Sequence, residues 1–283
     1  MSSLEKPILA WFKKNKRELP WRDTTPWGVM VSEYMLQQTP VNRVLPKWSE
    51  WMERWPTPND LAKATPAQVI TAWGRLGYPR RALRLHAAAQ IIAEDFNNQV
   101  PEDRETLLLL PGIGEYTAAA IAAFAFEQRS LVMDVNIRRL LVRAIDGEEH
   151  PKPAPTAQEK ARRLTILPTK NAHVWAAATM ELGALVCTSK NPSCELCPII
   201  GQCNWRKNGY PKTELVRKSQ DWHGTDRKCR GTIVQALRDN ESLTESAIKK
   251  MWPDESQVEK ALNTLLEDQL IQALPRRRYR LPQ

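Results

Sequence analysis

The sequence predicts an all-α protein that carries a small winged-helix-like module at its carboxyl end. Apolar residues recur at helical spacing through the first two-thirds of the chain, and the alternation typical of strands is nearly absent before residue 230. The pairs Thr39-Pro40, Thr57-Pro58 and Thr65-Pro66 each place a proline where it suits the first turn of a helix. A series of helices with frequent restarts is therefore expected.

The expected helices follow one another with short gaps. Residues 1–22 form the first, with Ile8, Leu9, Trp11 and Phe12 on one side, and residues 27–38 form the second. The third begins after Pro40 and has an apolar side made of Val41, Val44, Leu45, Trp48, Trp51 and Trp55. Further helices are expected at 66–75, 80–96 and 102–109, and then in GEYTAAAIAAFAF, VNIRRLLVRAID, TAQEKARRLTIL and NAHVWAAATMELGALV.

The last quarter of the chain differs in composition. Residues 204–232 hold eight Lys or Arg against three Asp or Glu, with few apolar residues, and we place a basic linker at 211–228. The module at 229–283 has three short helical segments and then QALPRRRYRLPQ, which suits a two-stranded wing. This is the order of a winged helix, often a contact module for nucleic acid or protein. The alternative is a helical cap that only stabilises the body.

The overall charge favours a polyanionic partner. The 283 residues include 41 Lys or Arg against 32 Asp or Glu, a net charge of +9 with a pI near 9.4, which suits phosphate contacts with DNA or RNA. No apolar run approaches the length of a membrane span, and the amino terminus does not resemble a secretory signal. Clustered thiols favour a reducing compartment, so we expect a cytoplasmic protein.

Four of the five cysteines fall in one short stretch, Cys187-x6-Cys194-x2-Cys197-x5-Cys203. Four thiolates so close in sequence can converge on one metal centre, and four thiolates are what a [4Fe–4S] cluster takes. A zinc site is the main alternative, but zinc sites usually show two short paired spacings, and only Cys194 and Cys197 are so paired. The spacing therefore predicts an iron–sulfur cluster, ahead of zinc or purely structural cysteines.

A second motif joins two helical segments through Pro111-Gly112-Ile113-Gly114. This turn has few bulky side chains, and the helix after it presents unpaired N–H groups and its positive dipole end. A phosphate is a natural ligand there. We interpret the motif as a helix-hairpin-helix element that contacts a DNA backbone without reading its sequence; an ordinary helix–helix turn is the alternative.

Two carboxyl groups are candidates for catalysis. Glu33 lies among the apolar residues of VSEYMLQQTPV, where desolvation would raise its pKa towards the range of a general acid. Asp134 precedes a helix that begins near Asn136. Each also has an ordinary interpretation, since Glu33 could be a solvated glutamate at a helix edge and Asp134 could be a helix N-cap.

These motifs together resemble the MutY-type adenine DNA glycosylases of the endonuclease III superfamily. The resemblance rests on the cysteine spacing and on VSEYMLQQTPV, RLGYPRRALRLHAAA, LPGIGEYTA, LVMDVNIRRLLVR and MELGALVCT, in that family's order, over about residues 8–210. It implies a helix-hairpin-helix lobe at 27–130 and an iron–sulfur lobe made of 1–26 and 131–210. It also implies double-stranded DNA with adenine opposite 8-oxoguanine or guanine as the partner, bound by a monomer that flips the adenine out.

The resemblance assigns a role to each candidate residue. Glu33 matches the acid that protonates the adenine ring, and Asp134 matches the carboxylate that stabilises the sugar cation. Tyr116 and Asn136 match residues that line the same pocket. Arg22 and Glu181 match residues that contact the flipped base, and Gln38 and Tyr78 match residues inserted into the duplex; a core position is the alternative for Tyr78. Strand-cleaving relatives have lysine at the position of Tyr116, so a monofunctional enzyme is expected.

The chain also departs from the family pattern. Full-length relatives usually carry a Nudix-like carboxy-terminal domain that contacts 8-oxoguanine, whereas here about eighty residues follow Cys203. Either the short module substitutes for that domain, or discrimination between 8-oxoguanine and guanine is lower. The alternatives are a mismatch-specific thymine glycosylase, an endonuclease III-like lyase, and a non-catalytic DNA-binding or redox-sensing iron–sulfur protein.

Overall fold

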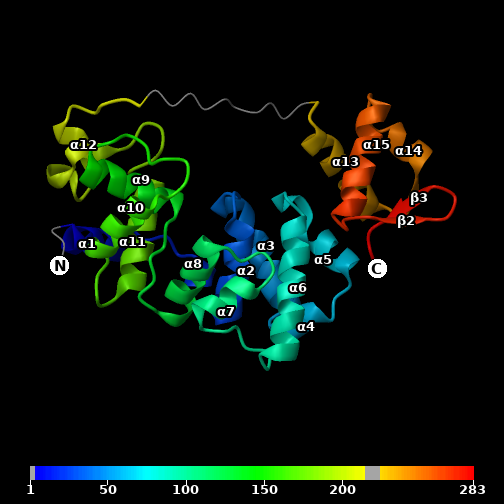
Figure 1. Cartoon of the computed structure of the whole chain (residues 1–283), viewed down its shortest axis with the longest axis horizontal. Helices are drawn as coiled ribbons and strands as arrows, with labels where there is room; N and C mark the ends of the chain where they lie inside the picture. Colours follow the sequence, from blue (N-terminus) through cyan, green and yellow to red (C-terminus); the bar gives the residue numbers. More distant parts are fainter. Residues whose placement is uncertain (1–3, 214–223) are drawn as a thin grey trace. The chain divides into compact units, whose positions relative to one another are not determined.

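The computed structural model describes residues 4–213 and 224–283, and in them the chain is mostly helical (Figure 1). The α-helices are α1 (Glu5–Asn15), α2 (Pro26–Leu36), α3 (Val41–Arg54), α4 (Pro58–Ala62), α5 (Pro66–Trp73), α6 (Arg80–Asp95), α7 (Arg104–Leu109), α8 (Glu115–Phe126), α9 (Val135–Leu141), α10 (Ala157–Ile166), α11 (Ala172–Leu185), α12 (Asn204–Lys207), α13 (Asp226–Asp239), α14 (Glu245–Lys249) and α15 (Glu255–Glu267). The all-α prediction is confirmed.

No helix in the described part of the chain is long and apolar enough to cross a membrane. Residues 214–223 of the predicted linker lie outside the described residues.

Threonine and proline start the helices largely as predicted. Thr57 and Thr65 each accept a hydrogen bond at Oγ1 from the third residue of the helix that follows, and both complete a capping box. Thr39 differs, because Pro40 is the N-cap of α3. The Oγ1 of Thr39 instead donates a hydrogen bond of 3.3 Å to the carbonyl of Leu76.

The described residues form two compact units that alternate along the sequence. Unit 1 contains residues 4–29, 102–109 and 113–213, and unit 2 contains residues 30–101, 110–112 and 224–283. The core of unit 1 is apolar and draws on α1, α8, α9 and α11. Its fully buried members include Ile8, Ala120, Leu140, Ala178 and Leu182.

Unit 2 has an aromatic core and a second apolar cluster. Trp51 and Trp73 are fully buried and meet edge to face with 5.4 Å between ring centroids. In the second cluster, Ile70 of α5 packs with residues of α13 and α15, such as Val234 and Leu262. The carboxy-terminal module is therefore part of the same unit as α5 and α6.

The module is winged-helix-like. Its order is α13, β1 (Leu243–Thr244), α14, α15, β2 (Gln272–Leu274) and β3 (Arg278–Arg280). The three strands are antiparallel in the order β1-β3-β2, and Tyr279 of β3 pairs with Leu243 on one side and Ala273 on the other. The predicted two-stranded wing thus gains a third strand, because the residues between α13 and α14 are extended and pair with β3.

Candidate active site and cysteine cavity

Glu33 is a buried carboxyl group of unit 2. It lies on α2, and only 6% of the residue is exposed, next to Tyr34, which is fully buried. The predicted desolvation of this side chain is confirmed, and the solvated helix edge is excluded. A carboxyl group in such surroundings is suited to holding and giving up a proton.

The hairpin turn contacts α2 directly. The hydroxyl of Tyr34 donates a hydrogen bond to the carbonyl of Pro111, and burial raises the pKa of Tyr34. Gly112 has a φ of +87°, and a Cβ there would lie 2.9 Å from the Tyr34 ring. Gly112 is therefore required both by its backbone conformation and by this close approach.

Gly114, unlike Gly112, lies in open surroundings. It is the N-cap of α8, with extended backbone, and a Cβ there would meet no atom within 4 Å. The backbone is therefore uncrowded on the Cβ side of Gly114, at the start of the twelve-residue helix α8. This geometry suits the predicted approach of a phosphate to the backbone.

Two residues are expected to enter the duplex, Gln38 and Tyr78. They lie on separate loops, and one arginine donates hydrogen bonds to both loops. Both have positive φ, 55° and 49°, and Tyr78 is 43% exposed, which excludes a core tyrosine. The buried guanidinium of Arg81 donates hydrogen bonds to the carbonyl oxygens of Tyr34, Met35, Gln37, Leu76 and Gly77. Burial lowers the pKa of Arg81 to about 10, so it remains charged at neutral pH. Sequence reasoning missed Arg81, which fixes both loops.

Asp134 belongs to unit 1 and is a helix N-cap, as its ordinary interpretation predicts. Its Oδ1 accepts hydrogen bonds from the amides of Asn136 at 2.6 Å and Ile137 at 3.4 Å. The cap fixes the carboxyl group at the amino end of α9, where the helix dipole stabilises negative charge. Capping and a catalytic role are compatible, because the two backbone hydrogen bonds hold the carboxyl group in place.

Asn136 and Tyr116 lie in the same unit as Asp134. The Oδ1 of Asn136 accepts a 2.8 Å hydrogen bond from Nη2 of Arg139, and Tyr116, near the start of α8, packs against the core of unit 1. Gly183 of α11 is tightly packed against Asn136, since a Cβ on Gly183 would lie 2.5 Å from the Asn136 carbonyl oxygen. The backbone of Asn136 is thus held by α11.

Arg22 and Glu181 are brought together, with Arg17 as a third partner. Glu181 is 1% exposed and accepts hydrogen bonds from Nε and Nη2 of Arg17, at 2.9 and 2.8 Å, and from Nη2 of Arg22 at 2.9 Å. Burial alone would raise the pKa of Glu181, but the hydrogen bonds from Arg17 and the charge of Arg22 outweigh it and hold the pKa below its ordinary value. Arg17 was not predicted.

The four clustered cysteines line a single cavity in unit 1. The remaining wall is mainly apolar and consists of Leu140, Arg143, Ala144, Val186, Pro192, Ile199, Ile200, Trp205 and Arg206. Burial raises the pKa of Cys187 and Cys194, and raises that of Cys197 to about 12. Burying these groups as thiolates therefore requires a positively charged centre to hold them.

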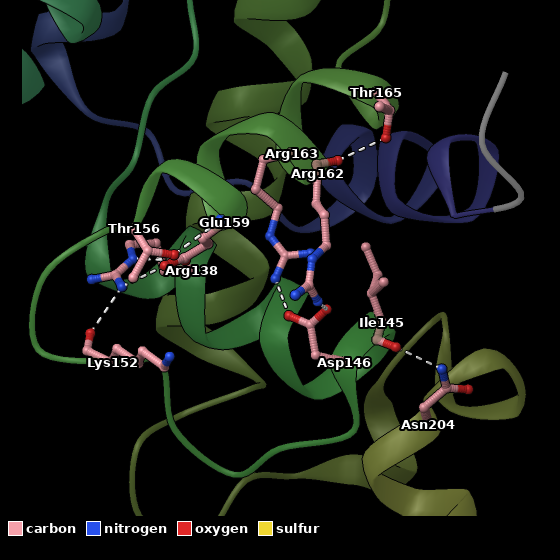
Figure 2. A network of polar contacts seen from close by, with 10 residues as sticks. All are labelled: Arg138, Ile145, Asp146, Lys152, Thr156, Glu159, Arg162, Arg163, Thr165 and Asn204. Carbon is pink, nitrogen blue, oxygen red and sulfur yellow. Dashed lines mark hydrogen bonds and ion pairs between the residues drawn. The ribbon is translucent and has the colours of Figure 1, made fainter.

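Arg143 supplies one positive charge at this cavity. It is 1% exposed, its Nη1 donates to Sγ of Cys187 at 3.4 Å, and its guanidinium stacks on Trp205 with 4.5 Å to the ring centroid. The cysteine loop is also tied down at its end, because Nδ2 of Asn204 donates to the carbonyl of Ile145 at 2.7 Å (Figure 2).

Figure 2 also shows the ion pairs that support this part of unit 1. Arg138 of α9 pairs with Glu159 of α10 at 2.7 Å, and both side chains are largely buried. Arg162 and Arg163 of α10 both bind Asp146, which ends the π-helix Val142–Asp146 that follows α9. These contacts hold α10 against α9, which carries Arg139, and against the π-helix, which carries Arg143.

The cysteine cavity presents a donor set of four thiols, which fits a thiolate-bound metal centre. Among the described residues, no group of three or more His, Cys, Asp or Glu is arranged to hold one metal ion. A zinc ion bonds each sulfur at about 2.3 Å and so draws four sulfurs close around one point, whereas a four-iron cluster binds each sulfur to a different iron and needs a wider set. Four cysteines line one mainly apolar cavity, and four thiolates are the ligand set that a four-iron cluster takes.

The chain is similar in sequence and in fold to known DNA repair proteins. The HhH-GPD superfamily of base excision DNA repair proteins matches residues 31–165. A protein named adenine DNA glycosylase from Mycobacterium tuberculosis strain H37Rv is 45% identical over 97% of this chain and 92% of that protein, and one from Mycolicibacterium smegmatis is 44% identical over 97% and 94%. A thermostable thymine-DNA glycosylase structure shares the fold, with a TM-score of 0.64 and 24% identity over 72% of this chain and 94% of that one.

The superfamily match spans Glu33, the hairpin turn and Asp134, which places the chain among the helix-hairpin-helix base excision repair proteins. Within that class, the sequence identity of 44–45% extends over nearly the whole length of the two mycobacterial proteins, and this identifies the family. The chain belongs to the adenine DNA glycosylase family.

Proposed function

We propose that this adenine DNA glycosylase acts on adenine mispaired with 8-oxoguanine or guanine and leaves an abasic site without cutting the strand. The observation that carries the proposal is the burial of Glu33 on α2 in a chain of this family. A glycosidic bond to adenine breaks slowly unless the leaving base is protonated, and a desolvated carboxylic acid supplies that proton.

The reaction divides between two carboxyl groups. Glu33 donates a proton to a ring nitrogen of the flipped adenine, and the bond between the anomeric carbon and the base then breaks. The electron pair leaves with the base, and the sugar becomes oxocarbenium-like. Asp134, which caps the amino end of α9, stabilises that charge. Water then adds to the anomeric carbon, and the proton that it releases returns to the Glu33 carboxylate. Tyr116 cannot form a Schiff base, so the strand stays intact.

DNA binding in this proposal draws on three features. The Pro111–Gly114 turn contacts the phosphate backbone through the amides at the start of α8. Gln38 and Tyr78, on the loops fixed by Arg81, enter the duplex beside the mispair. The exposed ring of Tyr78 can occupy the space that a flipped base leaves. Arg22 and Glu181 contact the flipped adenine.

We infer further that Cys187, Cys194, Cys197 and Cys203 hold a [4Fe–4S] cluster. The support is the shared cavity, the apolar wall and the buried cation of Arg143 beside Cys187. When bound, the cluster supplies a positively charged centre that holds the thiolates and fixes the loop. Arg143 offsets part of the thiolate charge, and Asn204 anchors the end of the loop to the π-helix.

Single-turnover cleavage tests the proposal. Duplexes with adenine opposite 8-oxoguanine, adenine opposite guanine, and thymine opposite guanine are each incubated with excess protein, and half of each sample is treated with alkali. Adenine release that requires alkali to break the strand is expected. Release of thymine would assign the chain to the mismatch-thymine branch, and no release would favour a non-catalytic DNA-binding protein.

A further inference from the structure

The carboxy-terminal module reaches the ring of Tyr78. Arg227, in the first turn of α13, stacks its guanidinium over that ring with 4.4 Å to the centroid. Arg81 lies 5.6 Å from the same centroid. Both distances are in the range where a cation is attracted to an aromatic face. The exposed ring of Tyr78 is thus contacted by one arginine from α6 and by one arginine from the module.

This contact belongs to a docked interface within unit 2. Ile70 of α5 is fully buried in the apolar cluster of the module, and Nε of Arg238 on α13 donates to the carbonyl of Ile70 at 3.1 Å. Asp268 accepts from Arg80 of α6 at 3.0 Å and also binds Arg230 of α13. The interface combines apolar burial, a main-chain hydrogen bond and an ion pair, so the position of Arg227 is fixed by the packing of α13.

We propose that Arg227 is a positioning residue for Tyr78, and that through it the module forms part of the duplex-binding surface. The proposal rests on the proposed function, in which Tyr78 enters the duplex. Stacking uses the face of a guanidinium and a phosphate contact uses its edge, so one arginine can steady the ring and contact the flanking phosphate at once. Through Arg227, the module thus positions the Tyr78 ring, which occupies the space that the flipped base leaves in the duplex.

Binding of wild-type and variant proteins to a duplex with a central adenine–guanine mispair, over a series of KCl concentrations, tests this. Arg227→Ala is expected to weaken binding about two- to five-fold by loss of stacking alone. The slope of log affinity against log salt should fall by about one if one phosphate contact is lost. Arg227→Lys should retain the salt slope while losing part of the affinity.

Two controls separate this effect from others. Lys250→Ala removes the same charge from an exposed position of the module and should leave affinity and slope nearly unchanged. Tyr78→Ala combined with Arg227→Ala should weaken binding by less than the product of the two single effects, because the residues act together. The inference would be refuted if the double variant lost affinity by the full product of the two single effects. It would also be refuted if the salt slope of Arg227→Ala equalled that of Lys250→Ala. Absence of adenine release by the wild-type protein in the single-turnover assay would instead refute the proposed function.

Discussion

Arg139 holds the side chain of Asn136 through a hydrogen bond of 2.8 Å from Nη2 to Oδ1. The same guanidinium donates to the carbonyl of Gly183 at 2.7 Å and, through Nε, to the carbonyl of Cys187 at 2.7 Å. One buried cation therefore joins a predicted pocket residue, helix α11 and the first cysteine of the loop. Asn136 and the cysteine loop therefore share a structural support within unit 1.

Replacing Arg139 with methionine should destabilise the protein by roughly 3 kcal/mol, because buried carbonyl groups lose charged donors. Urea unfolding gives the free energy of unfolding. Arg162→Ala is the matched control, since that arginine is half exposed and pairs with Asp146 at the surface, and it should cost less than about 1 kcal/mol. Equal losses in the two variants would contradict the buried role of Arg139.

Two glycines in helices should respond in opposite directions to alanine. Gly183→Ala places a Cβ 2.5 Å from the carbonyl oxygen of Asn136, so α11 must shift. The free energy of unfolding should fall by about 1–3 kcal/mol, and adenine release should be lost. Gly231→Ala in α13 meets nothing within 4 Å and should gain roughly 0.5–1 kcal/mol from helix propensity. Thermal and urea unfolding of both variants check the signs. A stabilising Gly183→Ala would show that this contact is loose.

The local parts of the structure were predictable from sequence. Thr57 and Thr65 start helices because the capping residue and the amide it binds are three positions apart. The burial of Glu33 followed from its apolar neighbours along one helix. The cysteine cavity followed from spacing, since seventeen consecutive residues contain all four thiols.

The arginines that organise the site were not predictable in the same way. Arg81 and Arg139 bind mostly main-chain carbonyls from distant segments. Every residue has such a carbonyl, so the sequence does not indicate which ones accept these hydrogen bonds. One signal was present, because Arg139 and Arg143 lie four apart in the apolar segment VNIRRLLVRAID and so share a helix side. The contact of Arg227 with Tyr78 depends on how the module docks, which local pattern does not encode.

Glu181 predicts a dependence of stability on pH. Its folded-state pKa lies below its ordinary value of 4.5, so the carboxylate contributes stability above that value and loses it as pH falls through the folded-state pKa. The free energy of unfolding should therefore differ most between wild type and Glu181→Gln at neutral pH, and the two should converge as the pH falls from 4.5 through the lower folded-state pKa. Unfolding curves from pH 3 to 7 measure this. A difference that does not change with pH would mean that the loss in the variant is not electrostatic.

Tyr116 should determine whether the strand is cut. Tyr116→Lys places a primary amine near the start of α8, where it could attack the sugar and form a Schiff base. Borohydride should then trap a covalent complex with adenine-containing mispaired DNA, and strand breaks should form without alkali. Tyr116→Phe is the control and should trap nothing while it retains adenine release. A lysine variant that folds and releases adenine but forms no trapped complex would contradict the position assigned to this residue.

Glu33→Gln should abolish adenine release while binding to the mispaired duplex persists. Glutamine has nearly the same shape and remains within the buried side of α2, but it cannot donate the proton that the leaving base needs. A loss of about 10²–10⁴-fold in the single-turnover rate is expected, which is the usual contribution of a general acid. Glu53→Gln, at an exposed position of α3, is the matched control and should react like wild type. Binding measured by fluorescence anisotropy separates the two interpretations of Glu33, because a parallel loss of affinity and rate would indicate a structural residue, whereas loss of rate alone identifies the acid.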